Sequence, residues 1–133
     1  MSDDYVLDAS AVVLALVGKR DAAEALRGRL GTMRRHAPHL VDAEVGDVLR
    51  RHEQRGLISP REAEVALRAS HVLVEHRYPH AGRLAELAWT WRANVSFYDG
   101  LYVALAVRLD VPLVSADAKL GNPPGVTCLF EPV

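Results

Sequence analysis

The sequence predicts an α/β domain with a mostly parallel central sheet flanked by helices, on the basis of three observations. A short apolar run over residues 5–7 ends in Asp8 and passes directly into a helical pattern. A second run, over residues 113–115, is followed by Ala116 and Asp117. Between the two runs, apolar residues recur mainly at three- and four-residue steps, the spacing of amphipathic helices. Strands separated by helices are typical of a parallel sheet, because parallel neighbours need long crossover connections.

The first half of the chain is expected to hold one strand and four helices. The helices share an apolar face, and they cover residues 11–16, 21–30, about 40–55 and a segment that begins at Ser59. A glycine follows each of the first two helices, as is usual at helix ends. The fourth helix has a strong start, because Ser59 suits the N-cap, Pro60 the first helical position and Glu62 the third. Residues 34–36, Arg-Arg-His, are predicted to form an exposed basic link.

The second half is expected to add three strands and two helices. The strands are short apolar runs within residues 71–75, 113–115 and 126–130. One helix lies around residues 84–91, and the other, capped by Ser96, covers residues 97–109. Residues 122–125, Asn-Pro-Pro-Gly, predict a turn before the last strand.

The size and composition favour one domain that spans residues 1–133. The chain is long enough for one hydrophobic core, and it contains no linker or repeat. No apolar run approaches the ~20 residues of a membrane span, so no membrane partner is expected. The polar N-terminus does not resemble a signal peptide, and the single cysteine, Cys128, leaves no internal disulfide. These features indicate a cytoplasmic protein.

Four acids occur where the predicted strands end or the predicted helices begin. Asp8 and Asp117 follow two strands, whereas Glu44 and Asp99 lie near the start of two helices. Because the carboxyl ends of parallel strands meet at one edge of a sheet, we expect the four side chains to converge there. Clustered carboxylates repel one another unless a cation intervenes. Hard oxygen ligands select Mg²⁺ or Mn²⁺, so the pattern predicts a divalent-metal site.

Each acid also has a purely structural interpretation when it is taken alone. Asp8 and Asp117 suit the N-caps of following helices. Asp99, three residues after Ser96, suits a capping box, and Glu44 suits the positive end of its helix. The metal hypothesis therefore depends on all four acids together.

Four segments, in this order and spacing, carry a resemblance to a known family. They are Val6–Ser10, Glu44 with Val48–Arg51, Tyr98–Ala106, and Leu113–Asp117. Together they resemble PIN-domain ribonucleases, specifically the VapC-type toxins of bacterial toxin–antitoxin pairs. The resemblance spans nearly the whole chain, and it implies the PIN-type three-layer sandwich with a mostly parallel sheet between helices.

The resemblance also implies the roles of individual residues. Asp8, Glu44, Asp99 and Asp117 match the acidic catalytic cluster that binds Mg²⁺ or Mn²⁺, with one or two ions left open. Ser10 and Ser115 match supporting positions where the family has a small hydroxyl residue. The implied reaction is endonucleolytic hydrolysis of structured RNA by a metal-activated water, leaving a 5′-phosphate. The implied partners are an RNA substrate, a VapB-type antitoxin and a second copy of the chain in a homodimer.

Basic side chains are the candidates for contact with the RNA backbone. The formal net charge is −1, with 16 basic and 17 acidic residues, so excluding four metal-binding acids leaves a mild basic surplus. Arginine suits bidentate contact with phosphate, although a solvated helix face is the simpler explanation for any single one. The candidate phosphate contacts are Arg34, Arg35, Arg50, Arg51 and Arg55. Asp42 and Asp47 flank Glu44 and are interpreted as solvated helix charges, with a contribution of Asp47 to the site left open.

Three competing functions were weighed against a metal-dependent ribonuclease. A phosphoaspartate phosphatase needs a second aspartate two residues after Asp8, where this chain has Ser10. A catalytically silent PIN-fold binding module is expected to lack a ligand acid, and none of the four is missing. A metal-dependent nuclease that acts on DNA uses the same chemistry, so the sequence does not decide between the two nucleic acids.

Overall fold

The computed structural model describes residues 3–117 and 128–133, and within them five parallel strands form one sheet. The strands lie in the order β3-β2-β1-β4-β5. Their bounds are β1 Asp4–Leu7, β2 Arg34–Pro38, β3 His76–Tyr78, β4 Leu113–Ser115 and β5 Phe130–Pro132. The two strands that precede Asp8 and Asp117 are therefore neighbours at the centre of the sheet, with Leu7 opposite Val114. The predicted parallel sheet is confirmed.

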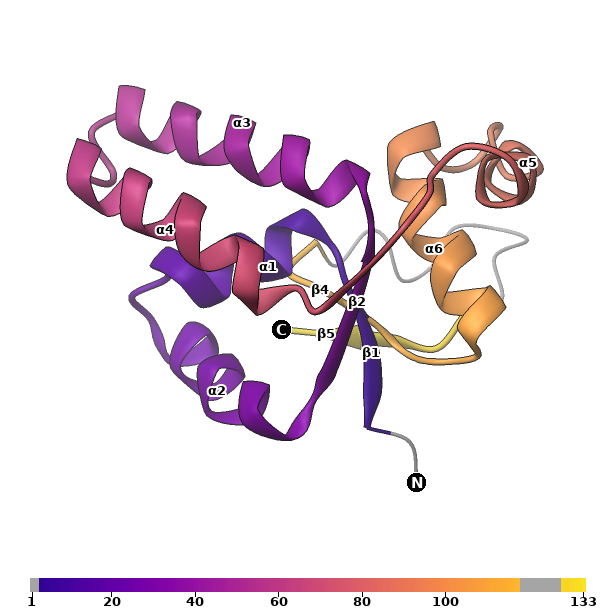
Figure 1. Ribbon diagram of the computed structural model, residues 1–133, viewed down its shortest axis with the longest axis horizontal. Coiled ribbons are helices and arrows are strands. Elements are labelled where there is room, and N and C mark those ends of the chain that lie inside the picture. The colour runs from indigo at the N-terminus through magenta and orange to yellow at the C-terminus, as the bar shows by residue number, and fades with distance from the viewer. Residues whose placement is uncertain (1–2, 118–127) are drawn as a thin grey trace.

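Helices cover both faces of this sheet. Their bounds are α1 Ala9–Val17, α2 Asp21–Arg29, α3 Leu40–Gln54, α4 Pro60–Leu73, α5 Arg83–Trp89 and α6 Phe97–Leu109, with a 3₁₀ turn at Leu30–Thr32. Figure 1 shows α1 to α4 on one side of the sheet and α5 with α6 on the other. This arrangement is the predicted three-layer sandwich. No helix in the described part of the chain is long and apolar enough to cross a membrane.

The predicted exposed link at residues 34–36 is wrong, because these residues begin strand β2. Arg34 and Arg35 pair in register with Asp4 and Tyr5 of β1, and His36 is buried. Because these side chains are polar, a prediction based on hydrophobicity does not identify the strand. Arg34, for example, forms two hydrogen bonds to the Asp4 carboxylate, at 3.0 and 2.9 Å.

Two other predicted strands are misplaced along the chain. The expected strand within residues 71–75 is wrong, because α4 continues to Leu73 and strand β3 begins at His76. Val72, which made this run look like a buried strand, is 73% exposed on α4. The last strand, β5, shares only Phe130 with the predicted range. The predicted turn at residues 122–125 lies outside the described residues.

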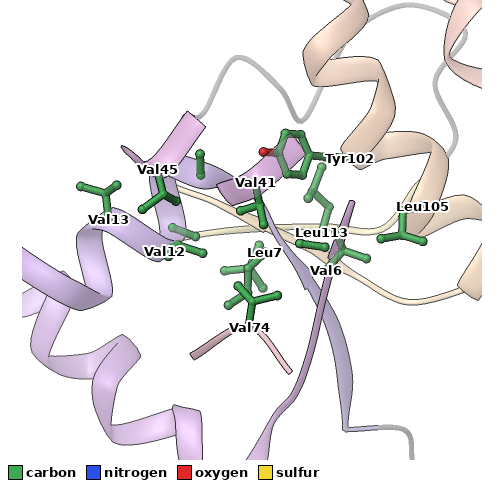
Figure 2. Packing of buried hydrophobic residues seen from close by; sticks show 14 of the residues in the cluster. Val6, Leu7, Val12, Val13, Val41, Val45, Val74, Tyr102, Leu105 and Leu113 are labelled. Carbon is green, nitrogen blue, oxygen red and sulfur yellow. The ribbon is translucent and has the colours of Figure 1, made fainter. Parts of the chain in front are cut away.

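The hydrophobic core fills both spaces between the sheet and the helices. Val6 and Leu7 of β1 are fully buried, and consecutive strand residues point to opposite faces. Figure 2 shows Leu7 on the side of Val12 and Val74, and Val6 on the side of Leu105. Because β1 is buried on both faces, the residue that follows it is held firmly at the edge of the sheet.

Candidate active site

Asp8 stands at the junction of β1 and α1 and is almost completely buried. Its backbone is extended, with φ −84° and ψ 174°, and its Oδ1 accepts the N–H of Ala11 at 2.9 Å. Asp8 is therefore the N-cap of α1, as its structural interpretation expects. Two hydroxyls also donate to this carboxylate, Ser10 to Oδ1 at 2.6 Å and Ser115 to Oδ2. The cap and the hydroxyls together fix the direction in which the carboxylate points.

Ser10 and Ser115 join the ends of the two central strands. Their Oγ atoms lie 3.3 Å apart. Ser10 Oγ accepts the N–H of Ala116, and Ser115 Oγ accepts the N–H of Asp117, each at 2.9 Å. The serine pair thus holds the backbone that carries Asp117 against the start of α1, two residues after Asp8.

Glu44 lies in the second turn of α3 and is held by a residue from the opposite layer. The hydroxyl of Tyr102, on α6, donates to Glu44 Oε1 at 2.6 Å. Tyr102 is 1% exposed, and Figure 2 shows its ring close to Val41 of α3. This contact crosses the carboxyl edge of the sheet, so it brings α3 and α6 together at the point where β1 ends.

Asp99 is the third residue of α6, and its position depends on the helix start. Ser96 is the N-cap, and its Oγ accepts the Asp99 N–H at 3.1 Å. Gly100 lets α6 approach α5 closely, because a Cβ there would lie 3.3 Å from the Cβ of Ala88. The first turn of α6 is therefore fixed both by its cap and by its packing against α5.

All four candidate acids line one pocket of about 470 Å³. Asp8 and Asp117 reach it from the carboxyl ends of the central strands, and Glu44 and Asp99 reach it from helices on opposite sides of the sheet. The remaining wall is largely apolar and includes Val13 of α1. The structure thus brings together the four acids that the sequence singled out.

Burial and mutual repulsion raise the pKa values of three of these carboxyl groups. For Asp8, Glu44 and Asp99 the largest cause is removal from water, which disfavours the charged form. Each pKa is raised further by neighbouring acids of the same pocket, such as Asp117 acting on Asp8 and Asp99 acting on Glu44. A bound cation would relieve both costs.

The carboxylate oxygens of the pocket are the type of ligand that a hard divalent cation prefers, although they are not arranged in a coordination geometry. Within residues 3–117 and 128–133, no group of three or more His, Cys, Asp or Glu side chains is arranged to hold a metal ion. Hydroxyl groups donate hydrogen bonds to the carboxylates of Asp8 and Glu44, and each carboxylate can accept further contacts. Four carboxylates in one pocket nevertheless match the oxygen ligands of Mg²⁺ and Mn²⁺, and Mg²⁺ retains several of its waters when bound.

The structure does not bring the candidate arginines to this pocket. Arg34 and Arg35 lie at the amino end of β2, the opposite edge of the sheet. The guanidinium of Arg35 also donates hydrogen bonds to nearby backbone carbonyls, among them that of Met33 at 2.9 Å. The arginines of α3 are outside the pocket lining as well. As phosphate contacts they remain predictions, and Arg34 and Arg35 are poorly placed for that role.

The acids that flank Glu44 serve the surface of α3. Asp47 pairs with Arg50 at 3.1 Å and with Arg51 at 2.6 Å, and it does not line the pocket. Asp42 accepts two hydrogen bonds from Arg77, at 2.7 and 2.9 Å. Asp42 is therefore more than a solvated charge, because it ties α3 to β3.

Sequence reasoning missed three polar residues of the pocket, namely Tyr102, Lys19 and His52. Tyr102 follows Asp99 by three residues and His52 follows Glu44 by eight, so helical spacing places each on the face of a candidate acid. That signal was available for both. Lys19 lies in the loop after α1, and no periodicity marks it.

Comparisons with known proteins show which family the chain resembles. The PIN domain family model matches residues 5–125. Ribonuclease VapC1 of Mycobacterium tuberculosis is 52% identical over 126 residues, which cover 95% of each chain. Ribonuclease VapC9 of the same species is 41% identical over 123 residues, covering 92% of this chain and 93% of the relative.

Solved structures share the fold at low sequence identity. VapBC2 from Rickettsia felis, bound to a DNA fragment from its promoter, has a TM-score of 0.71 at 14% identity and covers 98% of both chains. VapC20 of Mycobacterium tuberculosis, a toxin that cleaves the sarcin–ricin loop, has a TM-score of 0.68 at 15% identity and covers 88% of this chain and 92% of that chain. The family match over residues 5–125 and the relatives at 52% and 41% identity show that the chain belongs to the PIN-domain family and, within it, to the VapC ribonucleases.

Proposed function

We propose that this VapC ribonuclease is a Mg²⁺- or Mn²⁺-dependent endonuclease that hydrolyses phosphodiester bonds in structured RNA. The observation that carries the proposal is the convergence of Asp8, Glu44, Asp99 and Asp117 on one pocket. Without a counter-charge, this pocket would repel a phosphodiester. The acids therefore make sense as the ligands of a cation that attracts the substrate.

In such a site, some residues would bind the cation and others would orient the residues that bind it. Asp8, Glu44, Asp99 and Asp117 would hold the cation. When bound, it supplies an attacking water of lowered pKa and stabilises negative charge on the phosphorus oxygens. Ser10 and Ser115 orient Asp8, while Tyr102 orients Glu44. Because these carboxylates are pre-oriented by neutral donors, their negative charge is kept for the cation.

The chain is also proposed to act as the toxin partner of a VapB-type antitoxin. The Rickettsia felis structure describes VapB and VapC together, and this chain has the same fold. A second groove of about 460 Å³ meets the acidic pocket at Val17, Gly18 and Lys19. Its apolar floor and its cations, among them Arg27 and Arg61, suit an amphipathic antitoxin segment that carries acids. Homodimerisation remains a prediction from the family.

Cleavage of cellular RNA tests the proposed activity directly. Purified protein is incubated with total RNA and Mg²⁺, and the new 5′ ends are mapped. We expect discrete cuts that require the metal and disappear with EDTA. Asp8→Asn is the inactive control. Cutting by this variant at the wild-type rate, or equal cutting of single-stranded DNA, would contradict the assignment to metal-dependent cleavage of RNA.

A further inference from the structure

Three aromatic side chains are exposed where α5 ends and α6 begins. Trp89 is 56% exposed, Phe97 37% and Tyr98 58%. The other five aromatic rings of the chain, all in the described residues, are buried or half-buried. Exposed large rings gathered in one place mark an interaction surface, because each one leaves apolar area in water.

Two of these rings contact each other, and the guanidinium of an arginine lies over one of them. The rings of Trp89 and Phe97 meet edge to face, with centroids 6.3 Å apart and planes at 71°. The guanidinium of Arg92 lies 4.8 Å from the centre of the Trp89 ring and donates to the Trp89 carbonyl at 3.0 Å. Arg92 forms no ion pair with any carboxylate in the described residues. We call Trp89, Arg92, Phe97 and Tyr98 the aromatic patch.

The first turn of α6 carries residues of both the aromatic patch and the acidic pocket. Phe97 and Tyr98 directly precede Asp99, which lines the pocket. The close packing of Gly100 on Ala88 holds α5 against α6, so Trp89 is fixed relative to Asp99. A nucleic-acid strand with a phosphate at Asp99 would therefore have the exposed rings within reach of its neighbouring nucleotides.

We propose that the aromatic patch is a stacking platform for unpaired bases that flank the scissile phosphate, and this inference rests on the proposed ribonuclease function. Aromatic faces stack with any base, and an arginine on a ring adds a contact for the polyanionic backbone. Bases in a duplex are already stacked and do not reach such a platform. The patch thus selects RNA that is single-stranded or looped next to the cut.

The unpaired charge of Arg92 favours RNA over a second copy of this chain. A twofold interface built on the patch would bring into the same contact two Arg92 side chains, neither of which forms an ion pair with a carboxylate of the described residues. A polyanion instead supplies the missing negative charge. A second copy remains an outcome that the experiment distinguishes.

The test compares a double variant, Trp89→Ala with Tyr98→Ala, with the conservative pair Trp89→Phe with Tyr98→Phe. Val72→Ala, which changes a still more exposed apolar side chain on α4, is the matched control. A labelled single-stranded RNA 12-mer and the same RNA in a duplex are titrated in buffer with Ca²⁺ in place of Mg²⁺, so that a cation with oxygen ligands offsets the charge of the acidic pocket. Binding is followed by fluorescence anisotropy. Tryptophan emission is recorded in parallel, because stacking of a base on Trp89 quenches it.

We expect the wild-type protein to prefer the single strand, with quenching of its emission. The alanine pair should weaken single-strand binding by about tenfold and leave duplex binding unchanged. The phenylalanine pair should keep the affinity but lose the quenching, and Val72→Ala should match the wild-type protein.

Three results would overturn the platform: no single-strand preference, an equal loss on both RNAs, or unchanged RNA affinity of the alanine pair. Unchanged affinity together with a shift from dimer to monomer in light scattering would assign the patch to a second copy. Failure of the proposed function is separate, because it is seen as an absence of metal-dependent RNA cleavage by the wild-type protein. Wild-type cleavage together with unaltered binding by the alanine pair would sink the platform alone.

Discussion

The amino and carboxyl edges of the central sheet, where its strands begin and end, differ in whether their acids are paired with basic side chains. At the amino edge, Asp4 accepts hydrogen bonds from Arg34, and its Oδ1 lies 2.8 Å from His36 Nε2. At the carboxyl edge, Asp8, Glu44 and Asp99 pair with no cation among the described residues. Their hydrogen-bond donors are serine and tyrosine hydroxyls and one backbone N–H.

This difference separates structural charges from functional ones. A charge whose counter-charge belongs to the same chain stabilises the fold, as Arg34 does for Asp4. Several like charges gathered without one make the fold less stable, and they are retained because a ligand supplies the opposite charge. The comparison therefore predicts that changes at the two edges have different consequences.

The largest expected effect follows from removing one charge at the carboxyl edge. Asp99→Asn should lower RNA cleavage by about a thousandfold or more, because it removes a ligand of the catalytic cation. The metal-free protein should be as stable as the wild-type protein or more stable, since repulsion within the pocket falls. Cleavage rates and thermal unfolding in EDTA check the two parts. Asp47→Asn makes the same chemical change outside the pocket and should leave cleavage intact.

A smaller loss is expected when only the orientation of an acid changes. Tyr102→Phe removes the hydroxyl that donates to Glu44 and keeps the buried ring. Cleavage should fall about ten- to a hundredfold, as is usual when a residue that orients a metal ligand is lost. In single-turnover measurements across a Mn²⁺ titration, the variant should reach half of its maximal rate at a higher Mn²⁺ concentration than the wild-type protein. Equal rates at every metal concentration would mean that Tyr102 serves packing alone.

The amino edge should respond in stability and not in activity. Asp4→Ala leaves the buried His36 without its carboxylate partner and should cost about 1–2 kcal/mol of unfolding free energy. The exposed pair with Arg34 adds little to this figure, because solvent screens it. Urea unfolding measures the loss, and cleavage at a temperature where both proteins are folded should be unchanged. A large loss of cleavage by the folded variant would erase the distinction between the edges.

The smallest effect is a dependence on pH. Because the pKa values of Asp8, Glu44 and Asp99 are raised in the folded protein, the folded state binds these protons more tightly than the unfolded chain. Their repulsion is fully present above the folded pKa values and fades as the pH falls towards the ordinary values of 3.8 and 4.5. In EDTA, the stability advantage of Asp99→Asn over wild type should therefore shrink as the pH is lowered from 7 towards these ordinary values. A constant difference across this range would show that the carboxylates do not interact.

The parts of the fold that the sequence predicts well are those in which local signals agree. Ser59 and Glu62 form the predicted reciprocal capping box at the start of α4. Asp8 and Asp117 were predictable neighbours, because a parallel sheet places strand ends on one edge. The errors fall where tertiary partners override polarity, as in β2, where Arg35 is held largely by backbone carbonyls.

In the candidate site, too, local sequence position predicts some features, and others depend on tertiary packing. Its acids could be predicted because each sits at a strand end or early in a helix. The contact of Tyr102 with Glu44 joins residues 58 positions apart, so only the packing of α3 near α6 reveals it. The distance of Arg34 and Arg35 from the pocket likewise depended on knowing that they begin a strand.

Calorimetric titration with Mn²⁺ tests most directly whether the four acids share a cation. The wild-type protein should bind the metal, and each of Asp8→Asn, Glu44→Gln, Asp99→Asn and Asp117→Asn should weaken binding at least tenfold, while Asp47→Asn should bind as the wild-type protein does. Mn²⁺ binding that survives neutralisation of all four acids together would contradict the account.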